Sequence, residues 1–230
     1  MTLHFLMRYN EGILSFSDRK NSYDRHSEIF CKLFKIPCCE VYVLSSGHSP
    51  TIEELNTVLS QNNSINNATS AVEVIKNFIN QKVSDPAYMS IFNGGTPFEM
   101  AFFVIAKNDN NTEIHRMIHS IPSIVNLGNR ISHYIGSGGE YINLQIQKLR
   151  LTCSALTLEE ALTLGVSLMD FIADYDGSKV GKSIAMGCDV LIAPNSEQIY
   201  TKTIEGQNNY SKNLFQVCSE LNGEGKLNYG

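Results

Sequence analysis

Short apolar runs of alternating character dominate the first fifty residues. Glycine suits the turn of a β-hairpin, so Gly12 predicts a tight connection between the first two runs. Pro37 ends the third run, and the polar stretch 19–28 before it predicts a loop. The pattern predicts four strands here, at residues 2–7, 12–17, 29–36 and 40–44.

After residue 50, groups of segments with helical periodicity alternate with groups of segments with strand periodicity. A Thr-x-x-Glu capping box begins both the first and the last predicted helix. The predicted helices cover residues 51–60, 70–83, 140–149 and 157–175. Further strands are predicted at residues 99–106, 113–118, 131–135, 188–193 and 198–203.

The order of elements predicts the fold class. Helices come in pairs between groups of strands, and a doubly wound parallel sheet would need single alternation. We therefore predict an α+β fold, a four-layer α/β/β/α sandwich of two stacked, mainly antiparallel sheets with helices outside. No internal repeat or linker is evident, so residues 1–230 are expected to form one domain. Its core would span about 2–204, and 205–230 would be a polar, partly irregular C-terminal extension.

Composition narrows the class of protein. The chain has 230 residues, 43% of them hydrophobic, with a net charge of −5 and no cluster of Lys and Arg, which argues against nucleic-acid binding. The N-terminus lacks a basic segment before its apolar run, and no apolar run reaches the length of a membrane span. The six cysteines form no CxxC pair, so we expect buried thiols and a cytoplasmic location.

Thr2 follows Met1 directly and is the first candidate for chemistry. If Met1 is removed, Thr2 gains a free α-amine beside its own hydroxyl, which is the arrangement of an N-terminal nucleophile. Taken alone the signal is weak, because many cytosolic proteins carry a small second residue. Asp18 and Lys32, taken alone, would more often be a surface ion pair.

Several short motifs in order give these residues a shared context. No single one is specific, but with Met1-Thr2 they together resemble proteasome β-type subunits, and more closely the bacterial homologues called Anbu. The resemblance covers most of residues 1–204. The motifs are Ser17-Asp18-Arg19, Phe30-Cys31-Lys32-Leu33, Leu44-Ser45-Ser46-Gly47, Phe92-Asn93-Gly94-Gly95, Ile135-Gly136-Ser137-Gly138-Gly139 and Gly187-Cys188-Asp189-Val190-Leu191-Ile192.

The resemblance implies a role for each matching residue. Thr2 would be the nucleophile, Lys32 a fixed cation that favours loss of its hydroxyl proton, and Asp18 the partner that orients Lys32. The backbone N–H of Gly47 would face the developing oxyanion. Ser137 would hydrogen-bond near the terminal amine.

The resemblance is thinner after residue 175. Family members carry an acid and a serine in the loop before the strand at 188–193, and here Asp176 and Ser183 are the best matches. The loop between Asp18 and Lys32 is shorter than in most proteasome subunits. A pocket for the residue before the scissile bond would be lined by Phe30, Phe34, Ser45 and Ser49.

Two other motifs point elsewhere and are set aside. Residues 177–183 look like a phosphate-binding loop, but the glycines are one residue too close and a helix precedes the loop where a strand is required. His115 lies in the predicted strand 113–118 and His119 directly follows it, and no carboxylate motif accompanies them. We expect no metal and no cofactor.

The function predicted is a threonine-type N-terminal nucleophile peptidase of the Anbu class. The alternatives are an inactive structural or regulatory protein on the same fold, and an amidase or transpeptidase with the same nucleophile. The resemblance implies a homo-oligomer, as a ring or an open helical stack. It also implies a peptide or unfolded-protein substrate and, since the chain carries no ATPase module, a separate unfoldase.

Overall fold

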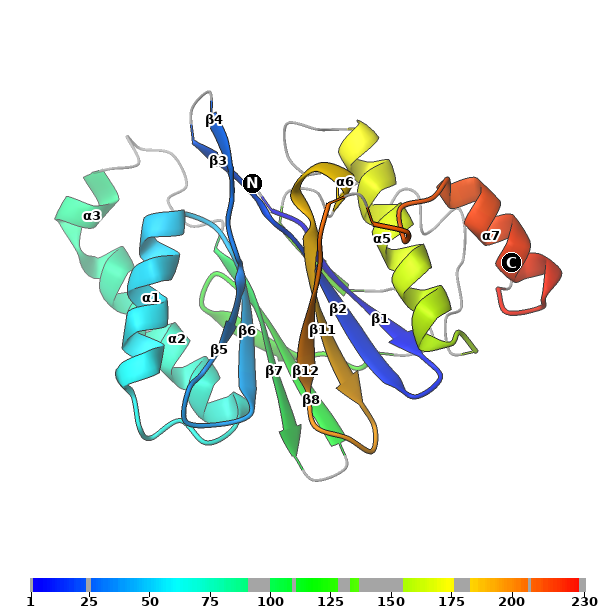
Figure 1. Cartoon of the computed structure of the whole chain (residues 1–230). Helices are drawn as coiled ribbons and strands as arrows, with labels where there is room; N and C mark the ends of the chain where they lie inside the picture. Colours follow the sequence, from blue (N-terminus) through cyan, green and yellow to red (C-terminus); the bar gives the residue numbers. More distant parts are fainter. Residues whose placement is uncertain are drawn as a thin grey trace. The chain divides into compact units, whose positions relative to one another are not determined.

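The computed structural model describes residues 2–23, 26–90, 100–108, 111–127, 133–136, 155–175, 183–206 and 208–227 (Figure 1). The chain divides into two compact units, Met1–Lys32 with Asn126–Gly230, and Leu33–Val125. Each unit contains a five-stranded antiparallel sheet with helices packed on one face. The predicted α+β class with two antiparallel sheets is confirmed.

The sheet of the first unit is centred on the N-terminal hairpin. In it, His4 pairs with Ser17 and Tyr9 with Gly12. Strands from distant parts of the chain flank the hairpin on both sides. In spatial order they are β10 (His133–Ile135), β1 (His4–Tyr9), β2 (Gly12–Asp18), β11 (Cys188–Pro194) and β12 (Tyr200–Ile204).

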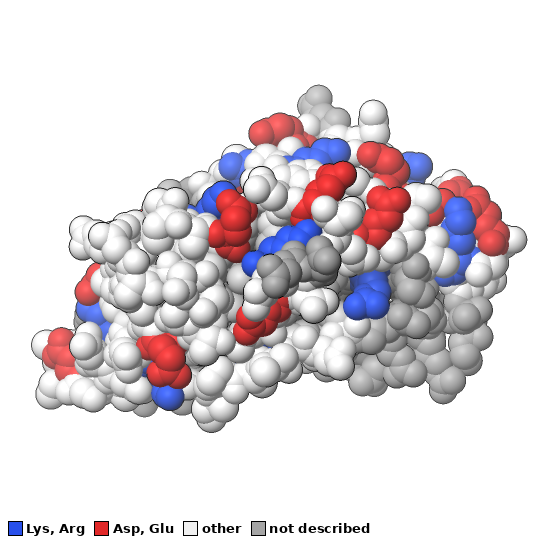
Figure 2. All heavy atoms as spheres, turned by 90° about the horizontal axis from the view of Figure 1, so that it is seen from below, with Lys and Arg blue, Asp and Glu red and all other residues white. Residues whose placement is uncertain are grey.

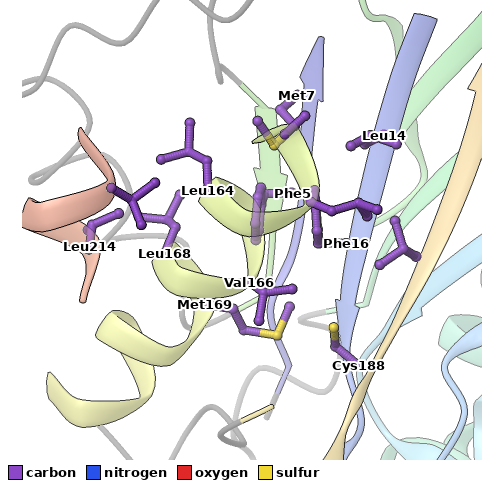
Figure 3. Packing of buried hydrophobic residues seen from close by; sticks show 14 of the residues in the cluster. Phe5, Met7, Leu14, Phe16, Leu164, Val166, Leu168, Met169, Cys188 and Leu214 are labelled. Atoms are coloured by element: carbon purple, nitrogen blue, oxygen red, sulfur yellow. The ribbon is translucent and has the colours of Figure 1, made fainter. Parts of the chain in front are cut away.

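One face of this sheet packs on the helix α5 (Leu158–Tyr175). Phe5 and Phe16 stack there, with ring centroids 4.9 Å apart, and Figure 3 shows them beside α5 side chains such as Leu164. Helix and sheet approach closely at Gly165, where an added Cβ would lie 2.1 Å from the Phe16 ring. Glycine is therefore required at this contact.

The C-terminal segment adds to the same core. Residues Leu214–Gly223 form α7, which packs against α5. Its buried face consists of Leu214, Val217, Cys218 and Leu221. A single-turn helix, α6 (Ser183–Met186), precedes β11. The segment 205–230 was expected to be polar and partly irregular, and within it the structure has this helix with one buried apolar face.

The second unit has the sheet order β5 to β9, each strand antiparallel to its neighbour. Its strands are β5 (Leu33–Lys35), β6 (Val41–Ser46), β7 (Ala101–Asn108), β8 (Asn111–Ile118) and β9 (Ile121–Ile124). The helices are α1 (Ser49–Gln61), α2 (Ala68–Ser84) and α3 (Pro86–Ser90). The apolar faces of α1 and α2 pack with Val43, Phe102 and Val104.

Three local predictions within the first 51 residues differ from the structure. Residues 19–28 were expected to be a loop, yet Lys20–Tyr23 (β3) and His26–Ile29 (β4) pair as a hairpin. The predicted strand 29–36 is interrupted between Ile29 and Leu33. The first helix begins at Ser49 and not at a Thr51 cap, and Pro50 occupies its first turn.

Candidate active site

The buried carboxylate of Asp18 is the centre of the site. Its Oδ1 accepts hydrogen bonds from the Leu3 amide at 2.7 Å and from Lys32 Nζ at 3.0 Å. Its Oδ2 accepts one from the Lys20 amide at 3.1 Å. The Leu3 amide belongs to the peptide bond that follows Thr2. Asp18 therefore holds the nucleophile candidate's own peptide link and the candidate cation on one oxygen atom.

The register of the N-terminal hairpin explains this contact. Since His4 lies opposite Ser17, one further residue places Leu3 opposite Asp18. The Asp18 amide accordingly donates to the Leu3 carbonyl at 3.1 Å. The length of the turn after β1 thus fixes Thr2 next to Asp18, and Thr2 itself is 4% exposed.

Lys32 lies between β4 and β5 and is 5% exposed. Burial lowers the pKa of this lysine, and the charge and hydrogen bond of Asp18 oppose that effect. Lys20 also lowers the pKa, whereas Asp189 raises it. A buried cation beside a carboxylate can both orient a neighbouring hydroxyl and stabilise its anion.

The Gly47 turn belongs to the second unit. Gly47 has a φ of +144°, a conformation that side chains disfavour, and an added Cβ would lie 2.8 Å from Met100 Cγ. The backbone here therefore requires glycine, which leaves the turn without a side chain. Ser45, two residues earlier in β6, is buried, and Ser49 is half-buried at the start of α1.

A chain of hydrogen bonds follows Gly47. His48 Nδ1 lies 2.9 Å from Thr51 Oγ1, which lies 2.5 Å from the hydroxyl of Tyr88. Lys82 Nζ stands 5.3 Å from the centroid of the Tyr88 ring. The chain joins the first turn of α1 to α3, so it fixes the turn that carries Gly47.

Not every predicted site residue is brought together. Asp18 and Lys32 form the expected pair, next to Thr2 in the same unit. Ser137 and Asp176 lie outside the described residues, and Ser183 begins α6 with its side chain outside them.

The two phenylalanines of the predicted pocket do not share a strand. The expected strand is interrupted between them: Phe30 lies after β4, while Phe34 lies within β5 and packs against the core of the second unit. The prediction of one continuous strand over 29–36, which would carry both, is therefore wrong. Because the strand is interrupted, Lys32 lies in the connection between β4 and β5 and not in a strand.

Two further groups lie close to the Asp18–Lys32 pair, and neither was among the predicted site residues. The Lys20 amide donates a hydrogen bond to Asp18, and no side-chain pattern can reveal a backbone donor. Asp189 is buried near Lys32, and its signal was visible as a lone charge in an otherwise apolar strand.

Surface charge, possible metal ligands and helix length bear on whether the protein binds nucleic acid, metal or a membrane. Acidic and basic side chains of the described residues are interspersed on the face seen in Figure 2. Among the described residues, no group of His, Cys, Asp or Glu could hold a metal ion. His115 is instead buried against Glu113, while His119 occupies the turn after β8. A membrane could not be crossed by any helix in the described part of the chain.

Solved structures of Anbu proteins are similar to this chain over almost its whole length. Anbu from Yersinia bercovieri, described as an ancestral β-subunit, has a TM-score of 0.67 at 19% identity, over 97% of this chain and 94% of that one. Anbu from Hyphomicrobium sp. strain MC1 has a TM-score of 0.66 at 17% identity, over 97% and 96% of the two chains.

A Gly-1 mutant of the Hyphomicrobium protein gives a TM-score of 0.66 at 15% identity, over 97% of this chain and 94% of that one. No family model and no curated protein sequence matches the chain. The structural similarity, together with the two sheet-and-helix units described above, shows that this chain has an Anbu-type, proteasome-like fold.

Proposed function

We propose that the protein is a threonine-type N-terminal nucleophile hydrolase that cleaves peptide bonds after removal of Met1. One observation carries the proposal: a fully buried carboxylate, Asp18, binds both the amide that follows Thr2 and the ammonium of Lys32. A buried ion pair is costly to maintain for stability alone. Its position beside the second residue of the chain favours a chemical role.

The proposed roles follow from the charges at the site. The free amine of Thr2, with an ordinary pKa of about 8, takes the hydroxyl proton at neutral pH. Lys32 is the fixed cation that stabilises the forming alkoxide, and Asp18 orients Lys32. Because burial lowers the pKa of Lys32, the paired Asp18 is needed to keep the lysine protonated.

The proposed reaction has two stages. Thr2 Oγ bonds to the substrate carbonyl carbon, the C–N bond breaks, and the leaving amine takes the proton held by the Thr2 amine. Water, activated by the same amine, then hydrolyses the ester and restores the hydroxyl. The Gly47 N–H is proposed to stabilise the oxyanion, and Ser137, Asp176 and Ser183 to support the amine.

The proposed substrate is a peptide or an unfolded protein. Phe30, Phe34, Ser45 and Ser49 remain the candidates for contacts with its side chains. We further propose a cytoplasmic homo-oligomer supplied by a separate unfoldase. These assignments rest on the similarity to Anbu and the proteasome β-type subunits.

Acylation by a β-lactone tests the proposal. The wild type and Thr2→Ser should both be acylated on residue 2, whereas Thr2→Ala should not react. Hydrolysis of a peptide library and of small amides by the same preparations separates a peptidase from an amidase. Absence of acylation in a preparation whose N-terminus is Thr2 would favour the inactive scaffold, and unchanged labelling of Thr2→Ala would place the nucleophile elsewhere.

A further inference from the structure

Asp189 is a second buried carboxylate of the first unit. It lies in β11, where its neighbours Cys188 and Val190 are fully buried, and its own side chain is 6% exposed. β11 pairs with β2, so that Asp189 lies opposite Ser17 and Cys188 opposite Asp18. A carboxylate in such a position is costly unless it is paired.

Its partners come from two neighbouring segments. Oδ1 accepts a hydrogen bond from the hydroxyl of Thr203 at 2.8 Å. Oδ2 forms an ion pair with Nε of Arg19 at 3.5 Å. Both atoms are buried, and neither makes a hydrogen bond to a described residue, so the ion pair is the interaction that compensates them. Arg19 Nη1 also lies 3.9 Å from Glu205, whose side chain is 81% exposed. Of these two carboxylates beside Arg19, Asp189 is therefore buried and Glu205 is exposed.

Arg19 stands at the base of the segment that connects the two site residues. It directly follows Asp18, and its carbonyl accepts a hydrogen bond from the Phe30 amide at 2.8 Å. That bond closes the β3–β4 hairpin, and Lys32 follows two residues later. A side chain that fixes Arg19 thus acts on both Asp18 and Lys32.

We propose that Asp189 is a positioning residue of the site. By holding Arg19, it fixes the backbone that brings Lys32 onto Asp18, and its negative charge helps to retain the Lys32 ammonium. It would be a strand-borne carboxylate in addition to the loop acid expected at Asp176. This inference rests on the proposed function for its catalytic consequence, but not for its effect on Lys32.

Electrostatics support the geometry. Among the described groups, Asp18 and Asp189 raise the pKa of Lys32, whereas burial and Lys20 lower it. Removing the charge of Asp189 should therefore lower the pKa of Lys32 further. A reaction that needs protonated Lys32 would then lose rate at a lower pH.

The test compares Asp189→Asn with Asp189→Glu and with Glu205→Gln, which removes the exposed carboxylate from the same arginine. In Asp189→Asn, the maximal rate of β-lactone acylation should fall by ~10²-fold, the scale expected for misplaced catalytic groups. The concentration for half-saturation should change little, and the alkaline limb of the pH profile should move down. Asp189→Glu should recover most of the rate, and Glu205→Gln should stay within about twofold, as expected for an exposed pair.

Two further measurements separate a failure of this inference from a failure of the proposed function. The Lys32 side chain is titrated by ¹³C NMR, with its signal assigned by Lys32→Arg, and its pKa should fall in Asp189→Asn even if no acylation occurs. An unchanged titration, or equal rates in Asp189→Asn and Glu205→Gln, overturns the proposal. If Asp189→Asn does not fold, Arg19→Gln should reproduce the loss of rate, because Asp189 then no longer holds the backbone at residue 19, and a normal rate in that variant overturns the proposal.

Discussion

At the scale of single residues, the site depends on one carboxylate with three donors. The resemblance to proteasome β-type subunits implied that Asp18 pairs with Lys32, and the structure gives this pair at 3.0 Å. The bond from the Leu3 amide was not predicted, because it depends on the register of the hairpin and not on any side chain. Motifs identify chemical groups, whereas backbone donors become visible only when the strands are paired.

Replacing Asp18 by Asn should strongly destabilise the protein. The amide keeps the shape but leaves the Lys32 ammonium buried without its counter-charge, so the free energy of unfolding should fall by about 3–5 kcal/mol. Urea unfolding monitored by circular dichroism measures the change. Glu40→Gln is the matched control, since it breaks the exposed Lys35–Glu40 pair and should cost less than about 1 kcal/mol. Equal small losses in both variants would contradict the buried-pair interpretation.

Lys32 also predicts a pH dependence of stability. Burial lowers its pKa in the folded state below the ordinary value of 10.5, so between these two values the unfolded chain binds more protons than the folded one. The free energy of unfolding should therefore gain a positive slope with pH in that window, because the cost of the buried charge is relieved as it deprotonates. Lys32→Met should lack this contribution. Parallel stability curves of the two proteins below pH 10.5 would contradict it.

At the scale of elements, one of the two predicted capping boxes marks the start of a helix and the other, at Thr51, does not. The Thr157–Glu160 capping box is present at the start of α5, where the Thr157 amide donates to Glu160 at 2.9 Å. The edge strand β9 was missed, because it contains Pro122 and all four of its residues are exposed. Its position depends on pairing with β8, which a periodicity pattern cannot report.

The contact between α5 and the N-terminal hairpin makes a prediction at this scale. In Gly165→Ala the new methyl group would overlap the Phe16 ring, and the free energy of unfolding should fall by about 1–3 kcal/mol. Gly223→Ala in α7 is the control, because no atom lies within 4 Å of the added Cβ, and its change should stay within about 0.5 kcal/mol. Thermal unfolding of both variants measures the difference. A stabilised Gly165→Ala would show that the helix is free to move away.

At the scale of the whole molecule, the order of elements was enough to predict the fold class. Paired helices between groups of strands exclude a doubly wound sheet, and the structure has two antiparallel sheets. The sequence could not tell that β10 and β11 flank the N-terminal hairpin, since that pairing joins segments more than a hundred residues apart. Those long-range pairs complete the unit that holds Thr2, Asp18 and Lys32.

The proposed mechanism requires a mature chain that begins with Thr2. The most direct measurement is the intact mass of the purified protein before and after incubation with a peptide epoxyketone, which reacts with a hydroxyl and an amine on the same residue. We predict the loss of one methionine from the chain and the gain of one inhibitor, with no gain in Thr2→Ala. Retention of Met1, or an inhibitor adduct that persists in Thr2→Ala, would contradict the account.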